Sequence, residues 1–221
     1  LIQQIGNGVV LGGLGSTYLY FDLGYQGGYY SNFSTFGLAA TAVLMVLYPA
    51  ISRKINRKPL MGVMIVTAAV GYVVMFVIGA FMPSSSPSLK CWLMTAGYML
   101  ANFGQYSFYL IMMISILNTV EYNELTRGER DEAIIASLRP FLTKLASALI
   151  SVITYVCYIV FGVLNYTNEI SELERLTSMG ELSEAAKLGE IADVITKVQP
   201  GQKFGLLVCI TLVPFIFMFV S

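Results

Sequence analysis

Residues 60–82 read LMGVMIVTAAVGYVVMFVIGAFM, an unbroken apolar stretch that contains no charged side chain. A helix needs about 20 mostly apolar residues to cross the hydrocarbon core of a lipid bilayer. We therefore expect this stretch to be a membrane-spanning helix, and it decides the class of the fold.

Similar apolar stretches recur along the whole chain. We expect six spans, at about residues 1–23, 32–51, 60–82, 91–117, 133–165 and 204–221. The fourth and fifth exceed the required length and should tilt or protrude into water. Hydrophobic residues make up 56% of the 221 positions and charged residues only 12%, with a mean hydropathy of +0.71. Soluble domains carry about 25% charged residues. The sequence thus predicts an all-α membrane fold, one bundle of six transmembrane helices over residues 1–221.

The charge balance and the missing histidine exclude several classes of function. The 13 basic and 13 acidic residues cancel, so we predict no nucleic-acid partner. Without histidine, a metal-ligand cluster or a nucleophile–base pair, nothing supports an enzyme, a cofactor or a metal site. Cys91, Cys157 and Cys209 lie far apart in apolar stretches and are interpreted as small buried hydrophobic residues.

The loops between the spans predict which side of the membrane each faces. Arg53, Lys54, Arg57 and Lys58 crowd the loop 52–59, immediately beside two spans. Basic loops stay on the cytoplasmic side. Loop 52–59, the charged loop that follows the fourth span and both chain ends are therefore expected in the cytoplasm, with the protein in the inner (plasma) membrane.

The long segment 166–203 then lies outside the cell. Ile170, Leu173 and Leu176 recur at helical spacing, and Ser171 with Glu174 matches a capping box. A second amphipathic stretch follows Gly180, with Leu182, Ala186, Ile191 and Val194, and we expect Pro200-Gly201 to end it. The segment is predicted to form a short helical hairpin over the outer mouth.

Lys144 is the most informative polar residue inside the spans. It lies twelve positions after Glu132, which places it about 18 Å into its helix, near the bilayer midplane. A lysine there costs about 2.5–3.5 kcal/mol on insertion scales, so it should face protein or water. The residues on the same helix face are Ser137, Pro140, Ser147, Ser151 and Tyr155. This stripe predicts the wall of a water-filled cavity, and a structural ion pair between helices is the alternative.

Neutral polar residues form stripes on two further spans. Asn102, Gln105 and Tyr109 share one face of the fourth span, and the first span carries Gln3, Asn7, Tyr18 and Asp22. Amides pair with hydroxyl groups and aromatic rings stack on sugar rings, so these residues suit sugar recognition. Hydrogen bonds that join helices are an equally good explanation for any single one. The glycines Gly8, Gly12, Gly13 and Gly15 predict close helix packing in the first span.

Residues 118–148 read NTVEYNELTRGERDEAIIASLRPFLTKLASA. This stretch resembles the signature of the glycoside–pentoside–hexuronide:cation symporters, the melibiose-permease-like branch of the major facilitator superfamily. The matching positions are Val120, Glu121, Tyr122, Glu124, Gly128, Arg130 and Lys144. Asn118 departs from the pattern, because many relatives have aspartate there and use it in an ion pair.

The resemblance implies the C-terminal six-helix half of a twelve-helix transporter. It also implies symport of a sugar or glycoside with sodium or a proton by alternating access. The coupling ion would be bound mostly by the missing N-terminal half. A non-transporting receptor or scaffold that keeps the fold is the alternative.

The resemblance also assigns roles to individual residues. Lys144 belongs to the cation and sugar pocket, and Tyr109 presents an aromatic ring to the sugar. The cytoplasmic gate consists of Glu121, Tyr122, Glu124 and Arg130. With the polar stripes, this gives a substrate-binding set of Lys144, Tyr109, Gln105, Asn102, Ser137 and Asn7.

Overall fold

The computed structural model describes residues 1–127 and 132–221, with the side chains at 27, 123, 127 and 132–136 left aside. Within these residues the chain is helical and has no strand. The five long helices are α3 (Gly27–Lys54), α4 (Arg57–Phe81), α5 (Pro87–Arg127), α6 (Glu132–Val160) and α9 (Pro200–Val220). Each is long and apolar enough to cross a membrane. They correspond to five of the six expected spans.

The first expected span, 1–23, is not one continuous helix. It is divided into α1 (Ile2–Val9), a kinked segment η1 (Val10–Leu14) and α2 (Gly15–Leu23). The break lies at Gly12, with φ −83° and ψ 22°, and at Gly13, with φ 120° and ψ −34°. Glycine is the residue that adopts a positive φ without steric cost, so the glycine run permits the break. Composition alone suggested a single span here.

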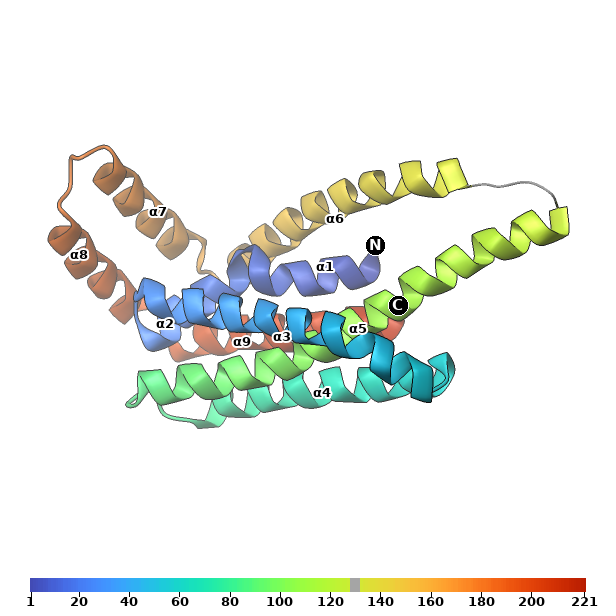
Figure 1. Cartoon of the computed structure of the whole chain (residues 1–221). Helices are drawn as coiled ribbons and strands as arrows, with labels where there is room; N and C mark the ends of the chain where they lie inside the picture. Colours follow the sequence, from blue (N-terminus) through green and yellow to red (C-terminus); the bar gives the residue numbers. More distant parts are fainter. Residues whose placement is uncertain (128–131) are drawn as a thin grey trace.

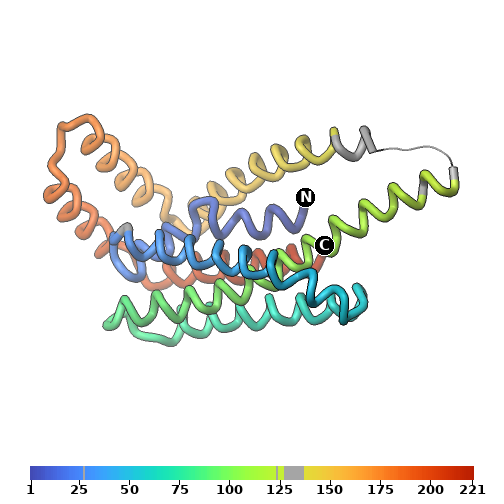
Figure 2. The backbone as a smooth tube through the Cα atoms, in the orientation of Figure 1, coloured from blue at the N-terminus to red at the C-terminus, as the bar shows by residue number. Residues whose placement is uncertain are grey.

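The helices form a bundle with α5 at its centre. α5 packs along α3 on one side and α4 on the other, and α9 lies against α1 and α4 (Figure 1). Val10, Leu14, Tyr98 and Leu206, from the first segment, α5 and α9, are fully or almost fully buried in the core between them. At 1.5 Å per residue, the 41 residues of α5 extend about 62 Å, twice the thickness of a bilayer core. As expected from its length, this helix protrudes beyond the bundle (Figure 2).

The connections gather at two opposite ends. The α3–α4 connection lies at the same end as the last turns of α5 and the first turns of α6, and α1 and α9 have their free ends toward that side (Figure 1). The α4–α5 connection and the pair α7 (Leu164–Ser178) and α8 (Glu184–Lys197) lie at the other end. This is the grouping that the order of the spans predicted, and the assignment of either end to the cytoplasm stays a prediction.

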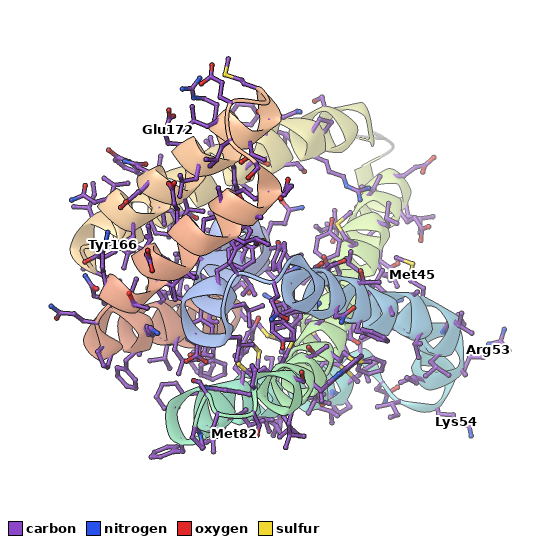
Figure 3. The ribbon with its side chains drawn as sticks, turned by 90° about the vertical axis from the view of Figure 1, so that its left-hand side faces the viewer. Met45, Arg53, Lys54, Met82, Tyr166 and Glu172 are labelled. Atoms are coloured by element: carbon purple, nitrogen blue, oxygen red, sulfur yellow. The ribbon has the colours of Figure 1, made fainter. Side chains whose placement is uncertain are left out.

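The α7–α8 pair confirms that this segment forms two helices, and its place over the outer mouth stays a prediction. Ile170, Leu173, Ile191 and Val194 are buried, as their helical spacing indicated, while Leu176 and Leu182 are partly buried and Ala186 is exposed. Figure 3 views this end, with Tyr166 and Glu172 of α7 labelled on the hairpin and Arg53 and Lys54 projecting from the far end of α3.

Two boundaries of the hairpin differ from expectation. α7 begins at Leu164, so Ser171 is in mid-helix and the capping box with Glu174 was wrong. The fifth span ends at Val160, because Gly162 turns the chain with φ 65°. Pro200 begins α9 and does not end α8, since proline fits the first position of a helix.

Candidate functional site

A polar cavity of about 370 Å³ lies between α1, α5 and α6. We call it the central cavity. Its lining residues are Gln3, Gln4, Asn7, Gly8, Leu11, Tyr106, Tyr109, Thr143, Ala146, Ser147 and Ile150. None of these side chains is charged. Amides, hydroxyls and two aromatic rings therefore define its chemistry.

Asn7 is the polar group in this lining that most clearly lacks a partner. Its side chain is only 9% exposed, and its Oδ1 is buried without a hydrogen bond. A buried acceptor left unpaired costs about 1–3 kcal/mol. Because Oδ1 is not exposed to the cavity as the side chain stands, the Asn7 side chain would have to rotate before a ligand hydroxyl could donate to it and remove this cost.

Tyr106 and Tyr109 supply the aromatic part of the cavity from α5. They are three residues apart, so both face the same side of the helix. Sequence reasoning identified Tyr109 and missed Tyr106, whose position one turn before Tyr109 was the available signal. Gln4, Thr143 and Ser147 were likewise not proposed as substrate contacts, although Ser147 belonged to the polar stripe.

Asn102 and Gln105 are fully buried between helices and do not line the central cavity. The Asn102 Nδ2 donates to the carbonyl oxygen of Gly37 at 3.0 Å, joining α5 to α3. The Gln105 Oε1 accepts from the hydroxyl of Tyr72 at 2.8 Å, and its main-chain oxygen accepts from Gln3 Nε2 at 3.1 Å. These bonds connect α5 with α4 and α1. Both residues therefore join helices, and one side-chain atom of each, Asn102 Oδ1 and Gln105 Nε2, is buried without a hydrogen bond.

Lys144 and Ser137 are exposed on α6 and are absent from the lining of the central cavity. α6 meets the rest of the bundle through its other side, where Ala146 and Thr154 are buried. In the part of the chain that the structure describes, Lys144 has no acidic partner. Thr143, next to it, does line the cavity. The polar stripe of α6 is thus a surface at the edge of the central cavity.

The predicted gate residues Glu121, Tyr122 and Glu124 are exposed on the part of α5 that protrudes from the bundle. Arg130 lies outside the described residues. Asn118 lies near the same end, and with its amide oxygen turned toward Arg57 it accepts from Nη1 and Nη2 at 2.5 and 3.2 Å. A neutral amide therefore occupies the place of the expected carboxylate while keeping a hydrogen bond between α5 and α4.

A deeply buried ion pair lies near the other end of the bundle. Lys90 Nζ is 2.7 Å from Asp22 Oδ2, and the two side chains are 2% and 11% exposed. Ser84 Oγ and Tyr18 OH also donate to this carboxylate. The pair joins α2 to α5. Lys90 immediately precedes the fourth expected span, 91–117, and the sequence analysis did not pair it with Asp22.

The central cavity has the chemistry for a neutral ligand with many hydroxyl groups. The orphan acceptor of Asn7 and the glutamines can pair with hydroxyls, and the rings of Tyr106 and Tyr109 offer flat apolar faces. Among the described residues no group of three or more acidic or cysteine side chains could hold a metal ion.

Comparison with known proteins agrees with this chemistry. Residues 2–221 match the family described as MFS/sugar transport protein. The raffinose carrier protein of Pediococcus pentosaceus is 28% identical over 113 residues, which are 51% of this chain and 16% of the carrier. A lactose permease of Lactobacillus delbrueckii subsp. bulgaricus is 33% identical over 102 residues, 46% of this chain and 15% of the permease. A lactose permease of Leuconostoc lactis is 28% identical over 102 residues, 46% of this chain and 14% of that permease.

These matched regions amount to about a sixth of the length of each relative. No solved structure matches the chain. The family match extends over almost every residue, including both the central cavity and the hairpin. This all-helical, multi-pass membrane chain belongs to the MFS/sugar transport protein family.

Proposed function

We propose that the chain is the C-terminal half of a cation-coupled sugar symporter that works by alternating access. The observation that carries the proposal is the uncharged central cavity, in which the buried Oδ1 of Asn7 lacks a partner. A sugar hydroxyl supplies the missing donor. The names of the relatives, raffinose carrier protein and lactose permease, support a sugar as the transported molecule.

The exposed polar face of α6 supports a partner half. Ser137, Lys144 and Ser151 lie on one side of a helix that is apolar enough to span a membrane. A charged lysine at that depth requires protein or water beside it. A second six-helix bundle against this face would enclose the central cavity and place Lys144 at its edge, where Lys144 contributes to coupling. We assign most ligands of the sodium ion or proton to that other half.

The charged end of α5 serves as the cytoplasmic gate in this proposal. Glu121, Tyr122 and Glu124 protrude beyond the bundle, where they can meet the other half. Arg130 completes the set. With the basic loop 52–59 at the same end, both ends of this chain face the cytoplasm of a cell whose plasma membrane holds the protein.

Uptake by proteoliposomes tests the proposal. The full-length protein that carries this chain is reconstituted, and entry of radiolabelled lactose and raffinose is followed under a sodium gradient, a proton gradient or neither. Accumulation above equilibrium under one gradient is expected. Specific sugar binding without flux would refute symport and favour a receptor. Equal entry under all three conditions would refute cation coupling.

A Lys144→Ala variant tests the role of that residue. Because Lys144 lies at the edge of the central cavity, we expect the gradient-driven accumulation to be lost while sugar binding persists. Full accumulation by the variant would remove Lys144 from the mechanism. Lys197→Ala, an exposed lysine at the end of α8 and outside the lining of the central cavity, is the matched control.

A further inference from the structure

A second polar cavity, of about 350 Å³, lies between α2, α6 and α7. We call it the hairpin cavity. Its walls include Thr17, Tyr20, Tyr155, Tyr158, Asn168 and Glu174, and none of its lining side chains is cationic. Its volume is in the range of small-molecule sites. None of its residues belongs to the central cavity.

Part of the hairpin cavity is held in place by hydrogen bonds between elements. The hydroxyls of Thr17 and Tyr158 are 2.7 Å apart and connect α2 with α6. Tyr25 OH donates to Glu174 Oε1 at 2.6 Å and so fixes the carboxylate of α7. Burial, together with this bond, raises the pKa of the Tyr25 hydroxyl, so Tyr25 remains a donor at neutral pH.

Other groups in the wall remain available for a ligand. Asn168 and the hydroxyl of Tyr155 have no hydrogen-bond partner among the described residues. Tyr155 as a residue is 55% exposed. An amide, a fixed carboxylate, several hydroxyls and exposed rings pair with hydroxyl groups and cover an apolar face. This is the chemistry that recognises a carbohydrate.

The two cavities lie in line along the contact between the first segment and α6. The central cavity contains Asn7 and Ser147, and the hairpin cavity contains Thr17 and Tyr155, farther along both elements. Between them, Ile150 fills the space beside Gly8 and Gly12. A Cβ added to Gly8 would lie 2.1 Å from Ile150 Cδ1, and one added to Gly12 would lie 2.7 Å from Ile150 Cγ2. The backbone break at Gly12–Gly13 is at this constriction.

We propose that the hairpin cavity is a second carbohydrate-binding position, which holds a sugar on the path to the central cavity and is separated from it by the Ile150–glycine constriction. The choice of carbohydrate as the ligand class rests on the proposed function. The presence of a binding position there is carried by the geometry of this cavity alone.

Protection of an introduced cysteine tests the second position without requiring transport. Asn168→Cys is made in the full-length protein, and its alkylation by a maleimide in detergent is followed by mass spectrometry of the peptide that contains residue 168. Lactose and raffinose are the probes, and glycine betaine at equal osmolarity is the blank. Asn165→Cys, on an exposed part of α7 outside the lining, is the matched control.

At a sugar concentration ten times its dissociation constant, alkylation at 168 should slow by about tenfold, because the unoccupied fraction falls by that factor. Alkylation at 165 should not change. The protection should persist when Asn7→Leu and Tyr109→Leu disable the central cavity. Absence of protection at 168, equal protection at 165, or loss of protection in the central-cavity variant would each overturn the proposal.

A further variant tests the second binding position if the central-cavity variant does not fold. Tyr155→Ala in the otherwise native protein should abolish the protection at 168, and unchanged protection would overturn the proposal. The two proposals also fail separately. Protection without any sugar uptake would refute symport alone, and gradient-driven uptake without protection would refute the second position alone.

Discussion

Asn7 and Asn102 have the same side chain but different surroundings. Asn102 is completely buried and joins α5 to α3 through its Nδ2, while its Oδ1 is buried without a hydrogen bond. Asn7 lies at a cavity wall with its Oδ1 unpaired. Buried polar groups without partners are rare in proteins and costly. Both residues carry such an oxygen, but of the two only Asn7 lines a cavity, so Asn7 is the stronger candidate for a substrate contact.

Replacing Asn7 by leucine should lower the affinity for sugar without lowering the stability of the fold. The variant loses an acceptor for a sugar hydroxyl, so its affinity for lactose or raffinose should fall about tenfold, or about 1.4 kcal/mol. Its melting temperature should stay the same or rise, because the unpaired buried oxygen is removed. Equilibrium binding and thermal unfolding in detergent measure the two effects, with Asn165→Leu as control. Unchanged affinity would exclude Asn7 from the site.

The ion pair of Lys90 and Asp22 should contribute strongly to folding stability only as a pair. Lys90→Met leaves the Asp22 carboxylate poorly exposed and without its cation, which costs about 3–5 kcal/mol in comparable buried pairs. Thermal unfolding should show a lower melting temperature for this variant. The double variant Lys90→Met with Asp22→Leu should recover most of the loss. A double variant no more stable than the single one would contradict this account.

At the scale of the elements, the first segment and α6 pack closely because glycines, which have no side chain, lie at their contact. Gly8 and Gly12 face Ile150 so closely that a methyl group on either would collide with it. Close helix packing was the role predicted for these glycines, and the structure confirms it for this pair of elements. The break in the first segment is a separate consequence of Gly12 and Gly13.

Gly8→Ala should therefore destabilise the bundle by about 1–3 kcal/mol, the usual cost of overpacking. Ile150→Ala makes room for the new methyl group, so the two substitutions together should cost less than the sum of the separate effects. A double-mutant cycle of thermal stabilities measures this coupling. If the stability losses of the two substitutions simply add, the collision between the new methyl group and Ile150 is not the cause of the destabilisation by Gly8→Ala.

At the scale of the whole molecule, the helices of this chain should move together. Alternating access requires one bundle to rock against another while each stays largely rigid. Here α9 packs on α1 and α4, and α1 also packs on α6. The thiols of Cys157 on α6 and Cys209 on α9 are 3.4 Å apart, so they report on movement between these two helices.

Oxidative cross-linking of Cys157 to Cys209 should therefore leave sugar uptake nearly unchanged. Copper phenanthroline removes two electrons and two protons from the thiol pair, and peptide mass spectrometry quantifies the bond formed. Cys157→Ser, treated identically, corrects for oxidation elsewhere. Abolished uptake in the cross-linked protein alone would show that α6 must move against α9 during transport.

Much of the architecture followed from local patterns. Apolar length identified the five long helices, and helical spacing identified the buried residues of the hairpin, because burial in lipid or against one neighbour depends on nearby residues. The predicted capping box at Ser171 was wrong because a capping pattern does not show where a helix begins. The helix begins earlier, at Leu164, after the turn at Gly162.

The candidate site depended on contacts that no local pattern contains. A helical face groups Asn102, Gln105 and Tyr109, but only packing decides that the first two meet neighbouring helices while Tyr109 meets a cavity. The sequence by itself determined that this is a polytopic helical membrane chain. Hydropathy and the helical spacing of apolar residues can both be read from residues that are close together in the chain. The tertiary structure alone decided which polar groups are paired and which, like the Oδ1 of Asn7, are buried without a partner, because pairing depends on residues far apart in the chain.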